Sequence, residues 1–449
     1  MGAREVFASA QDRYLIVPKL LFFLCSCQMY ASALYHTRYL AEVWDIPAEY
    51  SGRINFVVLL SIPAALAWSG LADKYRAHKR ILILKSCLFA ASYLSLWLLE
   101  PVVQGLSLQV RLGIVMLISL AVTQFCSAVF PLLSTLVLAI LEASPALQGC
   151  GFPAKQLLGR QKLFGTIGVA TVYFLNGYLT DFIAYRAQFL IVLVATSLFC
   201  IIAALALPET TLVPAEEQPI ARALDDPAPS VTARMYRLVR KPDFALLLFL
   251  LFSIGFVGAI FNAYFSVFMG MILAGTSRPN GSLATMAAVR MAVEIPIYLF
   301  GNVWIQLFGS YGVLLIGTLS SAVRAFGYAF LVHDAEDSYR AYLLELLKGA
   351  AHSCNGLAGS VLASDLADSN TQGLAQALIT SAHHHSAYFL SGVICSQYLS
   401  AHGASQLPIP EQIDVYRSLF LYAGLFTLIG VSLNTARLFL RPRAQVALK

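Results

Sequence analysis

Within residues 286 to 352, five charged side chains fall inside three successive segments that are otherwise apolar enough to cross a membrane. An ionised group at bilayer depth costs about 3 kcal/mol or more, so such groups must pair with one another or face water. The stretch is therefore the first candidate for a functional site. The five side chains are Arg290 and Glu294 in its first segment, Arg324 in the second, and Glu345 and Lys348 in the third.

The spacing of these residues predicts how they meet. Arg290 and Glu294 are four residues apart, so they share a helix face and can pair. Glu345, Lys348 and His352 follow one another at intervals of three and four and form one polar face of a helix. With a rise of about 1.5 Å per residue, all the charges lie roughly 8 to 15 Å below the outer surface. They can occupy one layer.

Two interpretations of this layer remain open. In the first, the charges are internal ion pairs that hold helices together. In the second, Glu294 or Glu345 binds and releases a proton. A carboxyl group removed from water binds a proton more readily, whereas a nearby cation weakens proton binding. Moving the cation toward or away from the carboxyl group therefore changes its proton affinity. Three cations against two carboxylates also leave one positive charge, which would suit an anionic substrate.

The composition indicates a membrane protein with many spans. Hydrophobic residues make up 58% of the 449 residues and charged residues only 12%, against roughly 25% charged residues in soluble domains. The eight cysteines show no spacing typical of a metal or redox site, so we expect neither a metal nor a cofactor. The fold class that follows is an all-α polytopic membrane protein.

Twelve apolar segments are long enough to cross the bilayer as helices. A polar, proline-containing linker at 208–242 separates six spans in residues 1–207 from six in 243–449. Two six-helix halves are typical of transporters built from repeats. The predicted spans are 19–41, 53–70, 81–99, 111–141, 163–181, 188–207, 243–273, 284–308, 311–332, 339–363, 371–400 and 414–437.

The distribution of basic residues predicts the orientation. Most of the 30 lysines and arginines fall on one side if both termini are cytoplasmic, as the positive-inside rule requires. The basic excess is thus topological, and no nucleic-acid partner is expected. The sequon Asn280-Gly281-Ser282 falls in a loop assigned to the outside and predicts glycosylation of Asn280.

The turn after the second span carries a recognisable pattern, Gly70-Leu71-Ala72-Asp73-Lys74-Tyr75-Arg76-Ala77-His78-Lys79-Arg80. Its charges alone would fit an ordinary cytoplasmic loop. The pattern also resembles the G-x-x-x-D-x-x-G-R-R/K loop of the major facilitator superfamily, with Ala77 and His78 in place of glycine and arginine. The resemblance implies a conformational latch. Its gating residues would be Gly70, Asp73, Arg76 and Arg80.

Three further stretches resemble the branch of this superfamily that contains lactose permease and nucleoside-proton symporters, closest to its fungal members. The resemblance implies a twelve-helix carrier with proton-handling groups in its second half, although Lys348 stands where many relatives have histidine. Close packing of membrane helices would equally explain the glycines of the first stretch. The stretches are Gly159 to Gly168, Glu294-Ile295-Pro296 with Arg324 to Tyr328, and Thr371-Gln372-Gly373-Leu374.

Other polar residues inside predicted spans are candidates for substrate or proton contacts. His383, His384 and His385 are consecutive, and successive helical positions point about 100° apart, so the three cannot form one metal site. We take His384 as the one most relevant to the cavity; hydrogen bonding within the bundle is the alternative. In the first half the candidate substrate contacts are Tyr35, His36, Arg38, Gln124 and Asn176.

The sequence contains no phosphate-binding loop and no nucleophile-base pair, so we expect neither an ATP-driven pump nor an enzyme. The predicted function is a secondary carrier of a small polar organic solute that works by alternating access, with protons as the coupling ion. The alternatives are a uniporter with structural ion pairs and a non-transporting receptor or scaffold. We expect a monomer in the plasma membrane or in a vacuolar or other internal membrane.

Overall fold

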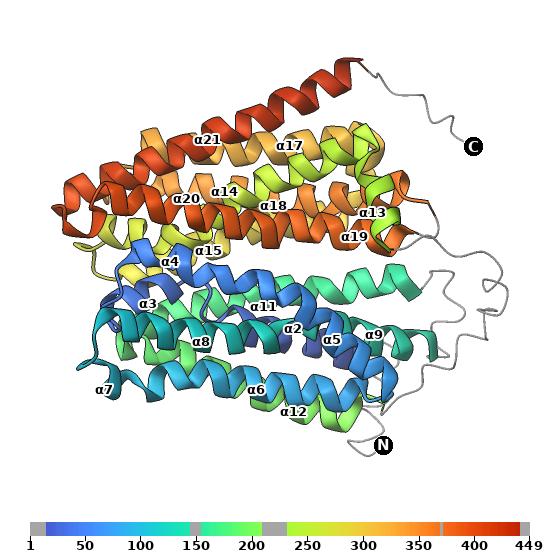
Figure 1. Ribbon diagram of the computed structural model, residues 1–449, viewed down its shortest axis with the longest axis horizontal. Coiled ribbons are helices and arrows are strands. Elements are labelled where there is room, and N and C mark those ends of the chain that lie inside the picture. The colour runs from blue at the N-terminus through green and yellow to red at the C-terminus, as the bar shows by residue number, and fades with distance from the viewer. Residues whose placement is uncertain (1–14, 144–153, 209–230, 369–370, 441–449) are drawn as a thin grey trace. The chain divides into compact units, whose positions relative to one another are not determined.

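The computed structural model describes residues 15–143, 154–208, 231–368 and 371–440. Within these ranges the chain is built of helices joined by short turns and contains no β-strand (Figure 1). The all-α prediction is confirmed.

Nine helical stretches of the described residues are long and apolar enough to cross a membrane. They include Pro242–Ile272, Gly301–Leu331 and Ile409–Leu440, all longer than the roughly 20 residues that a span requires. Every one of the twelve predicted spans overlaps helical residues, so the structure is consistent with twelve. The chain is thus an integral membrane protein that crosses the bilayer several times.

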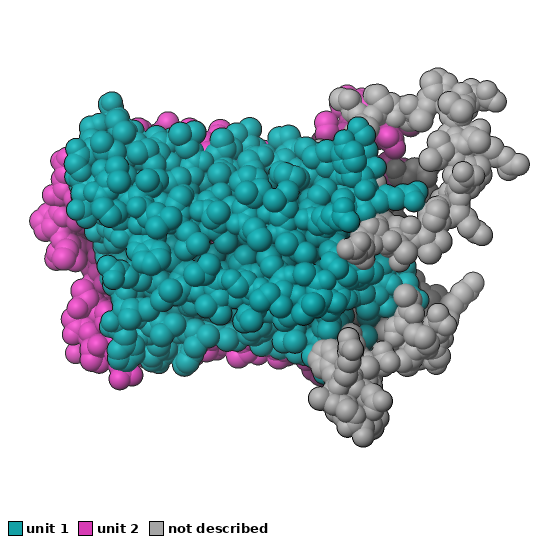
Figure 2. Space-filling view, turned by 90° about the horizontal axis from the view of Figure 1, so that it is seen from below, with its two compact units in different colours: residues 1–46, 60–222, 280–288 teal, residues 47–59, 223–279, 289–449 magenta. Residues whose placement is uncertain are grey.

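Contacts divide the chain into two compact units, coloured separately in Figure 2. Unit 1 comprises residues 1–46, 60–222 and 280–288; unit 2 comprises residues 47–59, 223–279 and 289–449. The predicted linker 208–242 falls in part on residues that the structure does not describe. The helix α13 (Val231–Val239) lies in its last third. The boundaries 1–207, 208–242 and 243–449 stay a prediction.

Unit 1 is organised around its first helix. α2 packs against α11 and α12, while α6 packs against α8 and α12. Phe22, Leu133 and Phe199 are among the buried side chains of its core. The helices of this unit are α2 (Ile16–Tyr30), α3 (His36–Glu42), α5 (Ser61–Lys74), α6 (His78–Leu98), α7 (Glu100–Val103), α8 (Leu108–Cys126), α9 (Val129–Ala143), α11 (Ala154–Ile183), α12 (Arg186–Ala206) and most of α15 (Pro279–Val289).

Unit 2 is organised around α14, which packs against α20 and α21, while α17 packs against α18 and α21. Phe244, Leu247 and Leu314 are among its buried core side chains. The helices of this unit are α4 (Ser51–Ile54), α13, α14 (Pro242–Ile272), α16 (Met291–Leu299), α17 (Gly301–Leu331), α18 (Ser338–Leu366), α19 (Gln372–Thr380), the π-helical segment Ser381–Ser386, α20 (Ala387–Ala401) and α21 (Ile409–Leu440).

Glycine allows a close helix approach within unit 2. A Cβ atom on Gly52 of α4 would lie 1.9 Å from the carbonyl oxygen of Gly392 on α20. No side chain fits into that space, so glycine is required for the two backbones to touch.

The backbone is broken repeatedly near the charged residues. α15 ends at Val289 and α16 begins at Met291, so Arg290 lies at a break. Within α17, Gly309 has φ 71° and ψ 162°, a conformation that glycine adopts without strain. This residue separates the predicted spans 284–308 and 311–332.

Candidate functional site: a charged cluster on α16, α17 and α18

Helices α16, α17 and α18 carry the charged residues of the candidate site. Both α16 and α17 pack against α18. A Cβ atom on Gly349 of α18 would lie 2.1 Å from the carbonyl oxygen of Arg290. Glycine at this position therefore lets α18 approach the break before α16 closely enough for their side chains to meet.

Glu345 is the centre of the most tightly bonded group. Its Oε1 atom accepts hydrogen bonds from Arg324 Nη2 at 2.5 Å, from Arg324 Nε at 3.0 Å and from the Tyr328 hydroxyl at 3.0 Å. The Arg324 and Glu345 side chains are 4% and 0% exposed. The guanidinium carbon of Arg324 also lies 3.8 Å from the centre of the Phe261 ring. These charge-assisted bonds hold α17 against α18.

Lys348 is held more loosely. Its Nζ atom lies 3.8 Å from Glu345 Oε2, beyond hydrogen-bond distance. Within the described part of the chain, that oxygen has no hydrogen-bond partner. Arg324 already occupies the other oxygen, so one carboxylate faces two cations. Two basic side chains thus lie near one carboxylate on this side of the cluster, and the predicted surplus of positive charge stays a prediction.

Glu294 has a different environment from Glu345. Its Oε2 atom lies 3.9 Å from Arg290 Nε and its Oε1 atom 3.8 Å from His352 Nε2. Both distances exceed those of a hydrogen bond. The Glu294 side chain is 4% exposed, whereas that of His352 is 47% exposed. Glu294 is thus a buried carboxylate with distant partners, one of which reaches the accessible surface.

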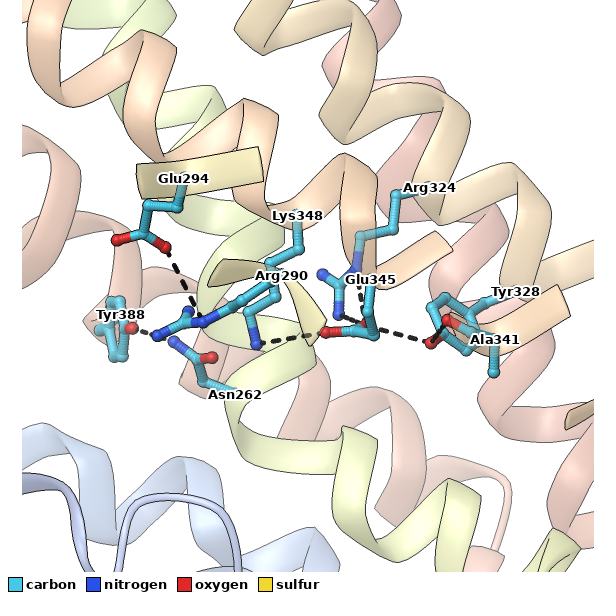
Figure 3. Close-up of polar contacts among 9 residues, drawn as sticks. All are labelled: Asn262, Arg290, Glu294, Arg324, Tyr328, Ala341, Glu345, Lys348 and Tyr388. Carbon is cyan, nitrogen blue, oxygen red and sulfur yellow. Dashed lines mark hydrogen bonds and ion pairs between the residues drawn. The ribbon is translucent and has the colours of Figure 1, made fainter. Parts of the chain in front are cut away.

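The structure brings all six predicted residues of the cluster together in unit 2. Figure 3 shows the ion pair between Arg290 and Glu294 and the contacts that join Lys348, Glu345, Arg324 and Tyr328. His352 joins through Glu294. The predicted pairing of residues four apart is present, but the pair between Arg324 and Glu345 joins two helices.

The three histidines lie in the π-helical segment Ser381–Ser386, a feature that often marks functional sites. His383 Nδ1 is 3.0 Å from the Leu251 carbonyl oxygen. His384 is exposed, and its ring lies 6.2 Å from that of Tyr388. No group of three potential metal ligands occurs among the described side chains.

The candidate contacts of the first half are mostly engaged in bonds between helices. Asn176 Nδ2 donates to the Ala31 carbonyl at 2.6 Å, and Gln124 Nε2 donates to the Leu60 carbonyl at 3.1 Å. His36 is half-buried at the start of α3. These bonds show what such residues do for packing and leave their role toward substrate a prediction.

Tyr35 and Arg38 meet the predicted glycosylation site, all within unit 1. The Tyr35 hydroxyl donates to the Asn280 carbonyl at 2.8 Å, and Arg38 Nη1 donates to Asn280 Oδ1 at 3.0 Å. Asp181 accepts from the backbone N–H groups of Asn280 and Gly281 at 3.1 and 2.8 Å. The Asn280 amide is thus engaged within the protein fold; its glycosylation stays a prediction.

The turn that resembles the signature loop joins α5 to α6. Arg76 has a left-handed backbone with φ 47°, and its side chain is exposed, as is that of Arg80. The side chain of Asp73 and the surroundings of Gly70 lie outside the described part of the structure. The gating role of the four residues stays a prediction.

Sequence reasoning missed several polar groups of the two units. Lys85 is fully buried within α6. Its Nζ atom donates to the Gln124 carbonyl at 3.0 Å, where α8 stops and the chain breaks before α9. In unit 2, Asn262 donates to the Tyr388 hydroxyl (Figure 3). The break between α8 and α9 explains the bond of Lys85, because it leaves carbonyl groups without a helical partner. No sequence pattern indicated the bond between Asn262 and Tyr388.

The fold is shared with solved transporter structures. A crystal structure of the nucleoside transporter NupG superposes with a TM-score of 0.72 at 15% sequence identity, covering 94% of this chain and 98% of that one. A D-xylose-proton symporter gives 0.64 at 14% identity, covering 92% and 96%. A POT family transporter in complex with 5-aminolevulinic acid gives 0.63 at 12%, covering 94% and 97%. At these identities the likeness establishes the fold.

Family membership follows from the sequence itself. No curated protein matches the chain at a significant level. The model of the family described as "MFS_1 like family" matches residues 15–405, which is most of the chain. The chain therefore belongs to the MFS_1-like family, whose fold is that of major facilitator transporters and not of enzymes.

Proposed function

We propose that this protein is a proton-coupled symporter that moves a small polar organic solute by alternating access. The observation that carries the proposal is the contrast between its two buried glutamates. Glu345 is fixed by short bonds to Arg324 and Tyr328, whereas both partners of Glu294 lie beyond hydrogen-bond distance. A proton carrier must be able to change partners, and Glu294 meets that requirement.

Glu294 is the coupling residue of this proposal, and Arg290 and His352 are its partners. Arg290 lies at the break before α16, so a rearrangement of this break would move its guanidinium away from Glu294. His352 is 47% exposed and connects the buried carboxylate with water. The bonds of Glu345 to Arg324 and Tyr328 then keep α17 and α18 together while α16 moves.

The solute class is supported by fold and chemistry. NupG is a nucleoside transporter and another structural neighbour is a D-xylose-proton symporter, so polar organic solutes suit this fold. His352, His384 and Asn262 offer exposed or half-exposed hydrogen-bonding groups in unit 2. In unit 1, the candidate substrate contacts stay Tyr35, His36, Arg38, Gln124 and Asn176. The carrier works as a monomer, in the plasma membrane or an internal membrane.

The test is uptake by the purified protein in liposomes. A panel of sugars, nucleosides and organic acids is offered with and without an inward proton gradient. We expect accumulation of at least one compound above equilibrium only with the gradient. Glu294→Gln is expected to reduce gradient-driven accumulation at least tenfold. The variant should still exchange labelled for unlabelled solute. Glu411→Gln, at an exposed site in the first turn of α21, is the matched control and should behave as wild type.

Other outcomes point to the alternatives. Solute that only equilibrates would mean a uniporter, with all the ion pairs structural. Binding of a solute without flux would mean a receptor on a carrier fold. Normal gradient-driven accumulation by Glu294→Gln would remove Glu294 from the coupling mechanism and leave Glu345 as the remaining buried carboxylate of the cluster to test.

A further inference from the structure

The short helix α13 lies immediately before a long apolar helix. It ends at Val239, and α14 begins at Pro242. α13 packs against α14 and α19 within unit 2, and Figure 1 shows it beside α19. Leu238 is 1% exposed and anchors it in the hydrophobic core of the unit. The helix is thus attached to the end of a candidate membrane span.

One face of α13 is apolar and uncovered. Met235 and Val239 are four residues apart and share a side of the helix, and Tyr236 lies next to them. They are 37%, 41% and 63% exposed. With Leu238, they form an apolar arc of roughly 160°, at about 100° per residue. Only the Leu238 end of this arc is covered by the described part of the chain.

The opposite face of α13 is basic. Arg237 and Arg240 are three residues apart and both are exposed. No described carboxylate lies within ion-pair distance of either. The guanidinium of Arg240 lies 5.6 Å from the centre of the Tyr236 ring, at the border between the two faces. Lys241 pairs instead with Asp368 at 3.3 Å and serves the protein's own packing.

We propose that α13 is an interfacial helix that binds the headgroups of anionic phospholipids in the membrane leaflet where α14 begins. A helix with a basic face and an exposed apolar face is stable in the interface, because its apolar side enters the acyl boundary and its cations reach phosphate. Basic residues directly next to a membrane span attract anionic lipid by about 1 kcal/mol each. Arg237 and Arg240 provide the cations, and Met235, Tyr236 and Val239 provide the apolar contact.

The test measures lipid binding by the purified full-length protein in a non-ionic detergent. Dioleoyl phosphatidylglycerol and dioleoyl phosphatidylcholine are titrated separately and bound lipid is quantified by native mass spectrometry. We expect tighter binding of phosphatidylglycerol. The double variant Arg237→Gln with Arg240→Gln should weaken that binding by about thirtyfold, about fivefold for each arginine. Arg237→Lys with Arg240→Lys keeps the charge and should retain binding.

Two controls make the result specific to α13. Arg186→Gln with Arg278→Gln removes the same charge from two exposed positions elsewhere and should leave binding unchanged. Inorganic phosphate should not displace the lipid. The proposal would be overturned if the wild type bound both lipids equally or if phosphate displaced the lipid. It would also be overturned if Arg186→Gln with Arg278→Gln weakened binding as much as Arg237→Gln with Arg240→Gln. None of these measurements depends on the transported solute.

Discussion

At the scale of single residues, bond distances separate two glutamates that look alike in the sequence. Glu345 accepts hydrogen bonds of 2.5 and 3.0 Å from one arginine, and Glu294 has its nearest basic side-chain nitrogens, from His352 and Arg290, at 3.8 and 3.9 Å. A buried pair is destabilising to break because it leaves an uncompensated charge, whereas removing both charges together is tolerated. Replacing Glu345 is therefore expected to reduce the stability of the fold more than replacing Glu294.

The pair Arg324 and Glu345 should behave as one unit. Arg324→Gln leaves Glu345 with only the more distant Lys348, and Glu345→Gln leaves two cations without their carboxylate, so each variant should destabilise the protein by about 3 to 5 kcal/mol. The double variant should recover part of this loss, since only Lys348 then lacks its partner. The measurement is the midpoint of thermal unfolding and the yield of monodisperse protein. Asp414→Asn, in a pair whose aspartate is 70% exposed, is the control and should change little. Additive losses in the double variant would contradict the interpretation.

At the scale of elements, helix breaks and glycine contacts decide where the charges meet. Arg290 lies between α15 and α16, and its carbonyl oxygen touches the backbone of α18 at Gly349. A larger residue there would separate α16 from α18 and move Glu294 away from His352. The site thus depends on a residue that carries no chemistry of its own.

Gly349→Ala should therefore disturb the site from a distance. Its methyl group would lie 2.1 Å from the Arg290 carbonyl oxygen, so the helices must shift at a cost of about 1 to 3 kcal/mol. We expect a lower unfolding midpoint and reduced gradient-driven uptake. Gly258→Ala in α14, where a Cβ atom meets nothing within 4 Å, is the matched control and should be neutral or slightly stabilising. Equal behaviour of the two variants would refute this role of Gly349.

Asp181 should stabilise the start of α15. Its carboxylate accepts from the N–H groups of Asn280 and Gly281, so Asp181→Ala should lower the stability by about 0.5 to 2 kcal/mol, as for other helix caps. Thermal unfolding measures this effect. Ser282→Ala removes the glycosylation sequon but not these bonds, and it should leave the midpoint unchanged. If Ser282→Ala lowered the unfolding midpoint as much as Asp181→Ala, the stabilisation of this region would be assigned to a glycan on Asn280 and not to the Asp181 bonds.

At the scale of the whole molecule, length and hydropathy set the number of spans and basic residues set their direction. The nine candidate spans of the described chain are consistent with the predicted twelve, and an even number such as twelve would put both termini on one side. The positive-inside rule assigns that side to the cytoplasm. Neither terminus lies within the described residues, so the orientation is a prediction to be tested directly.

Epitope tags at the two termini test this orientation. In intact cells both tags should be inaccessible to antibody or protease added outside, and both should become accessible after permeabilisation. A cysteine at the exposed Gly105, in a variant without the native cysteines, should react with an impermeant thiol reagent from outside. Accessibility of one tag only would require an odd number of spans, and accessibility of both would invert the topology.

The helical membrane fold, the family and the members of the charged cluster could be predicted from the sequence alone. These depend on local properties: apolar segments of sufficient length, the spacing of residues along one helix, and short motifs such as Glu294-Ile295-Pro296. The pairing of Arg290 with Glu294 could be predicted because residues four apart on a helix are neighbours whatever surrounds them.

The partner of a charged side chain on another helix follows from how the helices pack and could not be predicted from the sequence. Arg324 lies 21 residues from Glu345 in the chain, and helix packing alone brings them to 2.5 Å. Lys85 of α6 is buried, and packing within unit 1 brings its ammonium group to a carbonyl oxygen near the end of α8. The contrast between Glu345 and Glu294 and the uncovered face of α13 likewise depend on contacts between distant segments. Local sequence patterns contain no information about such contacts, because these arise from the packing of whole helices.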